Sequence, residues 1–289
     1  MMKCKIFDRT YELHLTFEDD LSSYYEVYRT NEDILVDTTV LSTFSHSIVS
    51  KIPFDQNGNI SVQTGTTSTK EQVIVNYNEK RVIHQMTFDP TFKRIQMESA
   101  PFNFDKQNAE LEHFKVGLAF ACSIMDDSGI VMHGSAISYK NQGVIFSADS
   151  GVGKSTQSNL WKKYKGLDVA IINDDKPALK ILESGVSVYG TPFSGKHHIN
   201  DNTSVPLSAI VFLKQGEMNR IKQLNTKEAI PALLNNTTRL DYASPQMGKY
   251  MTLIQSLVMQ IPIYQLECTI SEEAVDVAYE AIFGGKYEN

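Results

Sequence analysis

Short runs of alternating apolar and polar residues dominate the first hundred positions of the chain, and this alternation is typical of β-strands. Turn-forming residues at 55–59 and 77–80 interrupt these runs. Strands are therefore predicted at 12–17, 34–40, 59–65, 72–78 and 93–99. We expect residues 1–105 to form an antiparallel β-rich region, whose role is substrate binding, oligomer contacts or packing.

The pattern changes to helical spacing near residue 105, because apolar residues then recur every three or four positions over 108–126. The run from Val144 to Phe146 shows no alternation, as expected for a parallel strand buried on both faces. Further helices are predicted at 155–166, from an N-cap at Ser244 to 260, and at 271–283. Further strands are predicted at 130–140, 143–147, 168–173, 178–182, 185–190, 208–214 and 261–268. Residues 106–289 are therefore expected to form an α/β domain.

Residues 148–155 read A-D-S-G-V-G-K-S, close to the G-x-x-x-x-G-K-[S/T] pattern of a phosphate-binding loop between a strand and a helix. The glycines let backbone N–H groups approach phosphate oxygens, and the helix start adds a positive dipole end. Lys154 would meet the terminal phosphates, and the Ser155 hydroxyl suits Mg²⁺. Ala148 replaces the first glycine and would be strained at a positive φ. The predicted nucleotide-binding residues are Asp149, Ser150, Gly151, Val152, Gly153, Lys154, Ser155 and Thr156; Asp149 is expected mainly to form the turn.

The strand at 168–173 runs into two acidic residues, Asp174 and Asp175. Carboxylates at the carboxyl end of such a strand face the crevice in which α/β sheets bind ligands. One would hold the metal and the other would take a proton, unless one of them only caps a turn. His133 follows an apolar run beside the phosphate-loop strand, where it either contacts the γ-phosphate or is a core histidine.

Charge and cysteine content restrict the function classes. The net charge is -7, which argues against sequence-independent nucleic-acid binding. The three cysteines are far apart and form no C-x-x-C pair, which argues against structural zinc or a disulfide framework. The N-terminal residues lack a signal-peptide pattern, and the apolar stretch 116–125 is too short to span a bilayer. We expect a cytoplasmic protein with no membrane or nucleic-acid partner.

The order of these motifs resembles the catalytic domain of the HPr kinase/phosphorylase family. The matching stretches are HG at 133–134, DSGVGKS at 149–155 and NDD at 173–175, and the likeness covers about residues 128–180 well. The resemblance implies a phosphoenolpyruvate-carboxykinase-like P-loop fold and phosphorylation of a serine on a protein or peptide. It also implies that Asp174 is the general base, Asp175 binds the metal together with Ser155, and His133 contacts phosphate.

The chain also departs from this family. The E-x-R-G-L-G type stretch is absent, and VYGTPFSGKHH at 188–198 stands in its approximate place. The N-terminal half does not resemble that of HPr kinases, so HPr itself is not the expected acceptor. The segment GTPFSGK resembles HPr-kinase-related proteins that are encoded beside ribosomally made peptides.

The segment 190–198 has chemistry of its own. Lys196 either neutralises a transferring phosphoryl group or lies on a solvated loop. We expect His197 and His198 to be solvated, since adjacent histidines on a strand face opposite ways. Arg239 is a weaker candidate for charge stabilisation.

The resulting hypothesis is an ATP-dependent kinase that uses Mg²⁺ and transfers phosphate to a serine hydroxyl of a protein or precursor peptide. The predicted catalytic residues are Asp174, Lys154, His133 and Lys196. A homo-oligomer is expected. Two alternatives stay open at this stage: a small-molecule kinase or carboxykinase-like enzyme, and a non-catalytic nucleotide-binding module that recognises a peptide.

Overall fold

The computed structural model describes residues 1–31, 39–45, 61–66, 72–78, 81–89, 93–99, 105–195, 198–239 and 247–284. The chain divides into two compact units. Unit 1 comprises Met1–Asp126 with Arg239–Met247, and unit 2 comprises Asp127–Thr238 with Gly248–Asn289. The predicted division near residue 105 precedes the first long helix, whereas this helix belongs to unit 1.

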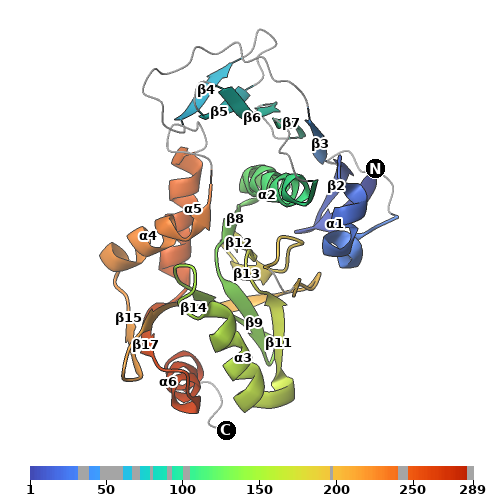
Figure 1. The fold of residues 1–289 in the computed structure, drawn as a ribbon. Helices are drawn as coiled ribbons and strands as arrows, with labels where there is room; N and C mark the ends of the chain where they lie inside the picture. Colours follow the sequence, from blue (N-terminus) through green and yellow to red (C-terminus); the bar gives the residue numbers. More distant parts are fainter. Residues whose placement is uncertain are drawn as a thin grey trace. The chain divides into compact units, whose positions relative to one another are not determined.

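Unit 1 is built around a seven-stranded sheet in the order β1-β2-β3-β7-β6-β5-β4 (Figure 1). Its strands are β1 (Met2–Ile6), β2 (Arg9–His14), β3 (Thr39–Ser45), β4 (Ser61–Thr66), β5 (Gln72–Asn78), β6 (Arg81–Phe88) and β7 (Arg94–Ser99). The expectation of an antiparallel region is wrong at the centre of the sheet, because β3 runs parallel to both β2 and β7. Strand β6 and helix α1 (Glu18–Tyr25) were not predicted; residues 34–38 of one predicted strand lie outside the described residues.

The predicted helix at 108–126 is present as α2 (Asp105–Ser123), with a 3₁₀ turn, η2, from Ile124 to Asp127. Its Glu112 carboxylate accepts hydrogen bonds from the backbone N–H groups of Thr16 at 2.8 Å and Phe17 at 2.9 Å. The Tyr11 hydroxyl lies 2.9 Å from the Ser123 hydroxyl. These contacts tie α2 to the N-terminal strands of the same unit, which explains why the helix belongs to unit 1.

Unit 2 contains a ten-stranded mixed sheet, as expected for an α/β protein. The main path has the order β11-β9-β10-β14-β13-β12-β8-β16, while β17 pairs with β14 and with β15. The strands are β8 (Gly129–Met132), β9 (Ser135–Tyr139), β10 (Gln142–Ser147), β11 (Val169–Asn173), β12 (Ala178–Leu182), β13 (Gly185–Tyr189), β14 (Ser204–Gln215), β15 (Arg220–Gln223), β16 (Thr237–Thr238) and β17 (Ile263–Cys268). The helices are α3 (Lys154–Lys165), α4 (Thr226–Asn235), α5 (Met247–Gln260, in unit 2 from Gly248) and α6 (Glu272–Phe283).

Three adjacent strands of unit 2 are parallel, since β14 pairs in parallel with β10 on one side and with β17 on the other. Strand β10 is buried from Gly143 to Ser147, so the prediction of a buried parallel strand is confirmed. Strand β11 differs from its prediction: it pairs antiparallel with β9 at the end of the sheet order, and Ala170 is exposed. The sequence of β11 shows no clear alternation of apolar and polar residues, because apolar residues such as Ala170 also lie on its more exposed face.

The single strand predicted at 130–140 is wrong, because the chain breaks at His133 and Gly134 into β8 and β9. The two strands occupy distant positions in the sheet order. Two predicted helix ends are confirmed: α3 stops before Gly166, whose φ is 69°, and the Ser271 side chain caps α6. The predicted N-cap Ser244 lies outside the described residues, as do residues 245 and 246.

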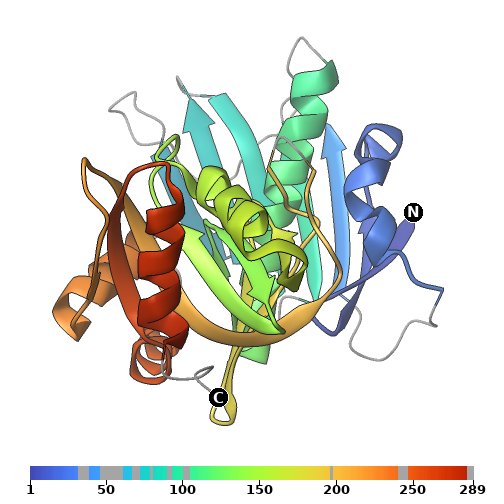
Figure 2. The ribbon, with the colours of Figure 1, turned by 90° about the horizontal axis from the view of Figure 1, so that it is seen from below.

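Helices α3 and α6 lie side by side over one face of the sheet of unit 2 (Figure 2). The fully buried Trp161 of α3 packs with Phe146 of β10, at a ring-centroid distance of 5.9 Å, and with Phe283 of α6 at 6.3 Å. This apolar core fixes the start of α3 against the end of β10. In the part of the chain that the structure describes, no helix is both long and apolar enough to cross a membrane.

Candidate active site

The loop between β10 and α3 has the backbone of an anion-binding turn. Gly151 and Gly153 have φ values of 82° and 122°, which residues other than glycine adopt only with strain. Ala148 does not belong to the described residues with a positive φ, so the alanine in place of the usual first glycine is not strained. Asp149 and Ser150 are exposed, and so are Ser155 and Thr156 on the first turn of α3. The loop therefore presents backbone N–H groups at a helix start, which is the arrangement that favours phosphate.

Lys154, the first residue of α3, is almost fully buried beneath this loop. Its Nζ donates hydrogen bonds to the carbonyl oxygens of Ala148 at 2.9 Å and Asp149 at 3.2 Å. Burial lowers the pKa of Lys154, while the nearby negative charge of Asp175 acts in the opposite direction. The loop thus holds a partly desolvated cation, and desolvation strengthens the attraction of a cation for an anion.

Asp175 stands between two basic side chains at the end of β11. Its Oδ1 lies 3.0 Å from His133 Nδ1, and its Oδ2 lies 3.5 Å from Lys176 Nζ. Burial acts to raise the pKa of Asp175, but the contact with His133 and the charge of Lys176 outweigh burial and lower it. The carboxylate is therefore ionised at neutral pH, as a metal ligand or an electrostatic partner must be.

Backbone hydrogen bonds bring His133 to this place. The N–H of Gly134 donates to the Asp175 carbonyl at 2.9 Å, and the Ser147 hydroxyl donates to the His133 carbonyl at 2.7 Å. A Cβ atom on Gly134 would lie 2.8 Å from Ile145 Cγ2 and 3.0 Å from the Phe146 carbonyl oxygen. The break between β8 and β9 thus needs glycine, because the chain passes too close to β10 at this point to leave room for a side chain.

Asn173 orients the acidic pair from within the core. Its Oδ1 accepts hydrogen bonds from the backbone N–H groups of Asp175 at 2.9 Å and Lys176 at 2.7 Å, forming an Asx turn. Its Nδ2 donates to the Thr191 carbonyl at 2.8 Å, and the Thr191 hydroxyl donates to the Lys176 carbonyl at 2.7 Å. Sequence reasoning did not single out Asn173, Lys176 or Thr191. These residues lie in the N-D-D-K and G-T stretches of the sequence. Residue type alone, however, does not predict the hydrogen bonds between the two stretches.

The two neighbouring aspartates face different surroundings. Asp174 is almost fully buried, and its Oδ1 accepts a hydrogen bond from the Gly195 N–H at 2.6 Å. Lys196, the predicted phosphoryl-stabilising residue, and His197 lie outside the described residues. Arg239 belongs to unit 1, whereas the other candidate residues belong to unit 2. The structure therefore brings Lys154, His133 and Asp175 together and separates the environment of Asp174 from that of Asp175.

The oxygen donors fit a hard cation that is shared with phosphate. Among the described residues, no three His, Cys, Asp or Glu side chains are grouped closely enough to hold a metal on their own. Mg²⁺ usually keeps several waters and takes one or two protein oxygens plus substrate phosphates. The ionised Asp175 carboxylate and the exposed Ser155 hydroxyl are oxygen donors of the kind that such a site would use.

Comparison with known proteins adds little. No protein-family model matches the chain, and no curated protein sequence matches it. Among solved structures, the chain is similar to the HPr(Ser) kinase/phosphatase from Coxiella burnetii, with 10% sequence identity and a TM-score of 0.31. The match covers 52% of this chain and 95% of that one. At this level of similarity no functional conclusion passes from one protein to the other, so the site itself must support any function.

Proposed function

We propose that the chain is an ATP-dependent phosphotransferase that uses Mg²⁺ and phosphorylates a serine hydroxyl of a protein or peptide. We also propose that unit 2 has a phosphoenolpyruvate-carboxykinase-like P-loop fold, with unit 1 contributing to acceptor binding. The observation that carries the proposal is the meeting of a buried P-loop lysine, Lys154, with the ionised Asp175 and with His133. Phosphoryl transfer depends mainly on positioning and charge stabilisation, and this cluster supplies both.

In the proposed reaction the serine Oγ attacks the γ-phosphorus, and the bond from that phosphorus to the β-phosphate oxygen breaks. ADP leaves, and the hydroxyl proton passes to Asp174. The Gly195 N–H donates to Oδ1 of Asp174 at 2.6 Å and so fixes the orientation of the proposed base. A bound Mg²⁺ would neutralise phosphate charge, with Ser155 and Asp175 as its protein ligands.

Lys154 and His133 act on the phosphates in this proposal. Lys154 exchanges its two carbonyl partners in the loop for phosphate oxygens. Nδ1 of His133 faces the Asp175 carboxylate, and Nε2 would donate to the transferring group in the protonated form of the ring, in which both nitrogens carry a hydrogen. Lys196 is proposed to add a positive charge from the 190–198 segment.

The direct test is a transfer assay with γ-labelled ATP, Mg²⁺ and a serine-containing peptide library. We expect labelled phosphoserine with the wild-type protein and transfer slower by about 10²–10⁴-fold with Asp174→Asn, while both proteins bind Mg²⁺-ATP with similar affinity. Nucleotide binding without transfer to any peptide or protein acceptor would argue for a small-molecule kinase or a binding module instead.

A further inference from the structure

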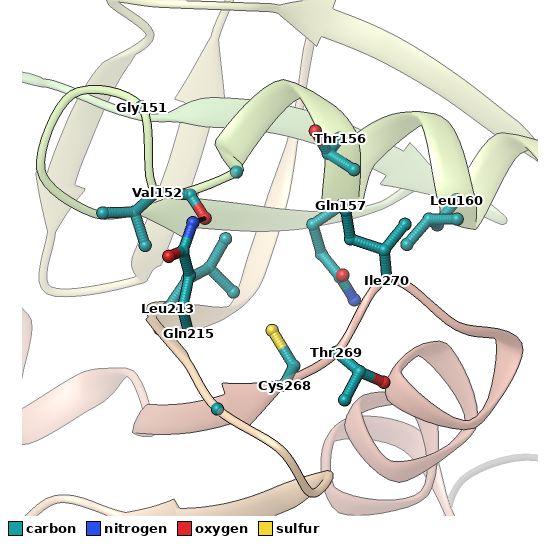
Figure 3. A pocket seen from close by; sticks show the side chains of 12 residues that line it. Gly151, Val152, Thr156, Gln157, Leu160, Leu213, Gln215, Cys268, Thr269 and Ile270 are labelled. Atoms are coloured by element: carbon teal, nitrogen blue, oxygen red, sulfur yellow. Dashed lines mark hydrogen bonds between the residues drawn. The ribbon is translucent and has the colours of Figure 1, made fainter.

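A cavity lies beside the loop between β10 and α3. Its volume is about 380 Å³, within the range of small-molecule sites in proteins. Figure 3 shows its lining, which comes from three segments of unit 2. These segments are Gly151–Leu160 of the P-loop and α3, Leu213–Gly216 at the end of β14, and Cys268–Ile270 after β17.

The position of this cavity follows from the parallel strands. Strand β14 is parallel to β10 and to β17, so the carboxyl ends of all three strands meet at the edge where the P-loop begins. Ligands of α/β sheets bind at that edge. A molecule whose phosphates occupy the P-loop would therefore extend its remaining part toward the ends of β14 and β17.

An unsatisfied amide points into the cavity. The Gln157 side chain is 2% exposed, and its Nε2 has no hydrogen-bond partner among the described residues. In Figure 3 its amide end is directed toward Cys268 and Thr269 across the cavity. A buried donor without a partner costs free energy, and a ligand acceptor at this point would remove that cost.

The rest of the lining combines aliphatic side chains, which suit a planar ring system, with the polar side chains of Thr156, Gln215 and Thr269. Val152, Leu160 and Leu213 contribute aliphatic side chains, and Ile270 stands at the edge with 79% of its surface exposed. A large aliphatic side chain with that exposure gains by covering a flat apolar ligand surface. Small-molecule sites usually combine apolar side chains with a few directed polar groups, and this cavity contains both kinds.

We infer that this cavity binds the nucleoside part of a nucleoside triphosphate, with Gln157 hydrogen-bonding the base. The inference rests on the proposed function, because it assumes that the P-loop holds the phosphates. It goes further in naming the subsite that distinguishes a nucleotide from inorganic polyphosphate. In this proposal the nucleoside contacts Gln157, Leu160 and Cys268, and these residues distinguish a nucleotide from inorganic polyphosphate.

The test compares Mg²⁺-ATP with inorganic Mg²⁺-triphosphate by calorimetry on the whole protein. The wild-type protein should bind ATP at least about tenfold more tightly than triphosphate, since one directed hydrogen bond and apolar burial are added. Gln157→Leu should weaken ATP about tenfold and leave triphosphate unchanged. The matched control is Asn159→Leu, an exposed amide on the same helix, which should change neither affinity.

The rate of chemical modification of Cys268 provides a second test, which uses the wild-type protein and no Gln157 variant. Cys4 and Cys122 are fully buried, whereas Cys268 is partly exposed, so a thiol reagent should modify Cys268 first in the folded protein. ATP should slow this modification several-fold and triphosphate should not. Equal affinities of the wild-type protein for ATP and triphosphate would overturn the nucleoside subsite while leaving the phosphate loop intact. If neither compound binds, the proposed function fails and this inference fails with it.

Discussion

His133 and Asp175 meet side chain to side chain, with Nδ1 3.0 Å from Oδ1, and the residue after His133 also bonds the Asp175 backbone. The segment that carries the acidic pair thus contacts both the imidazole ring of His133 and the backbone of the residue that follows it. The break between β8 and β9 also lies directly beside β10, since Gly134 approaches Ile145 and Phe146.

Lys154→Met should abolish Mg²⁺-ATP binding without destabilising the fold. The lysine is buried with a lowered pKa, so its charge already carries a desolvation cost that a methionine of similar length removes. Calorimetry measures the affinity and urea denaturation measures the free energy of unfolding. The model of Lys154 as the phosphate-binding cation would be wrong if this variant kept wild-type nucleotide affinity.

Asp174→Asn and Asp175→Asn should fail in different ways. Loss of the proposed base should slow single-turnover transfer by about 10²–10⁴-fold and leave Mg²⁺-ATP affinity nearly unchanged. Loss of the proposed metal ligand should weaken Mg²⁺-ATP binding as well as transfer. The reverse pattern would exchange the two assignments, and full transfer by both variants would remove the paired-aspartate mechanism.

The contribution of Asp175 to stability should depend on pH. Its pKa in the folded protein is lowered from 3.8, so the stabilisation is present above pH 3.8 and is lost as the pH falls through the folded-state value. We expect the wild-type advantage over Asp175→Asn in urea denaturation to be constant near neutral pH and to shrink below about pH 4. An advantage that stays unchanged down to the lowest pH at which the protein remains folded would contradict the contacts with His133 and Lys176.

Gly134→Ala should destabilise unit 2 by about 1–3 kcal/mol, because its new methyl group would press on Ile145 and on the Phe146 backbone. The matched control is Gly248→Ala in α5, where a Cβ atom meets nothing within 4 Å. That substitution should be neutral or stabilising, by up to about 1 kcal/mol, since alanine favours helix over glycine. Equal unfolding free energies for the two variants would show that the close approach at Gly134 is not required.

Asn173→Ala should weaken both the fold and the site. The substitution leaves the buried Asp175 and Lys176 backbone donors without their acceptor, at a cost of about 1–3 kcal/mol. Asn173→Asp keeps the acceptor and should retain more stability in urea denaturation, although it loses the amide donor to Thr191. An Asn173→Ala protein as stable as the wild type would mean that another group satisfies the turn.

Some of this architecture is determined locally, and the sequence alone was enough to predict it. A short apolar run followed by small residues and G-K-S-T strongly favours a strand, a tight turn and the start of a helix. Strand β10 and helix α3 were therefore predicted at nearly their observed bounds. The same holds for the ends of α3 and α6, where Gly166 and Ser271 satisfy the helix termini through their own backbone and side chain.

Tertiary structure decided everything that depends on which strands become neighbours. The sequence showed strands near 39–45 and 94–99 but not that they pair in parallel, because alternation reports the exposed face of a strand and not its direction. It singled out His133 and Asp175 but not their contact, because the two residues lie far apart in the sequence, and it did not single out Gln157. Whether an amide such as Gln157 faces a cavity or a hydrogen-bond acceptor depends on the packing of α3 against the ends of β14 and β17, which no local pattern encodes.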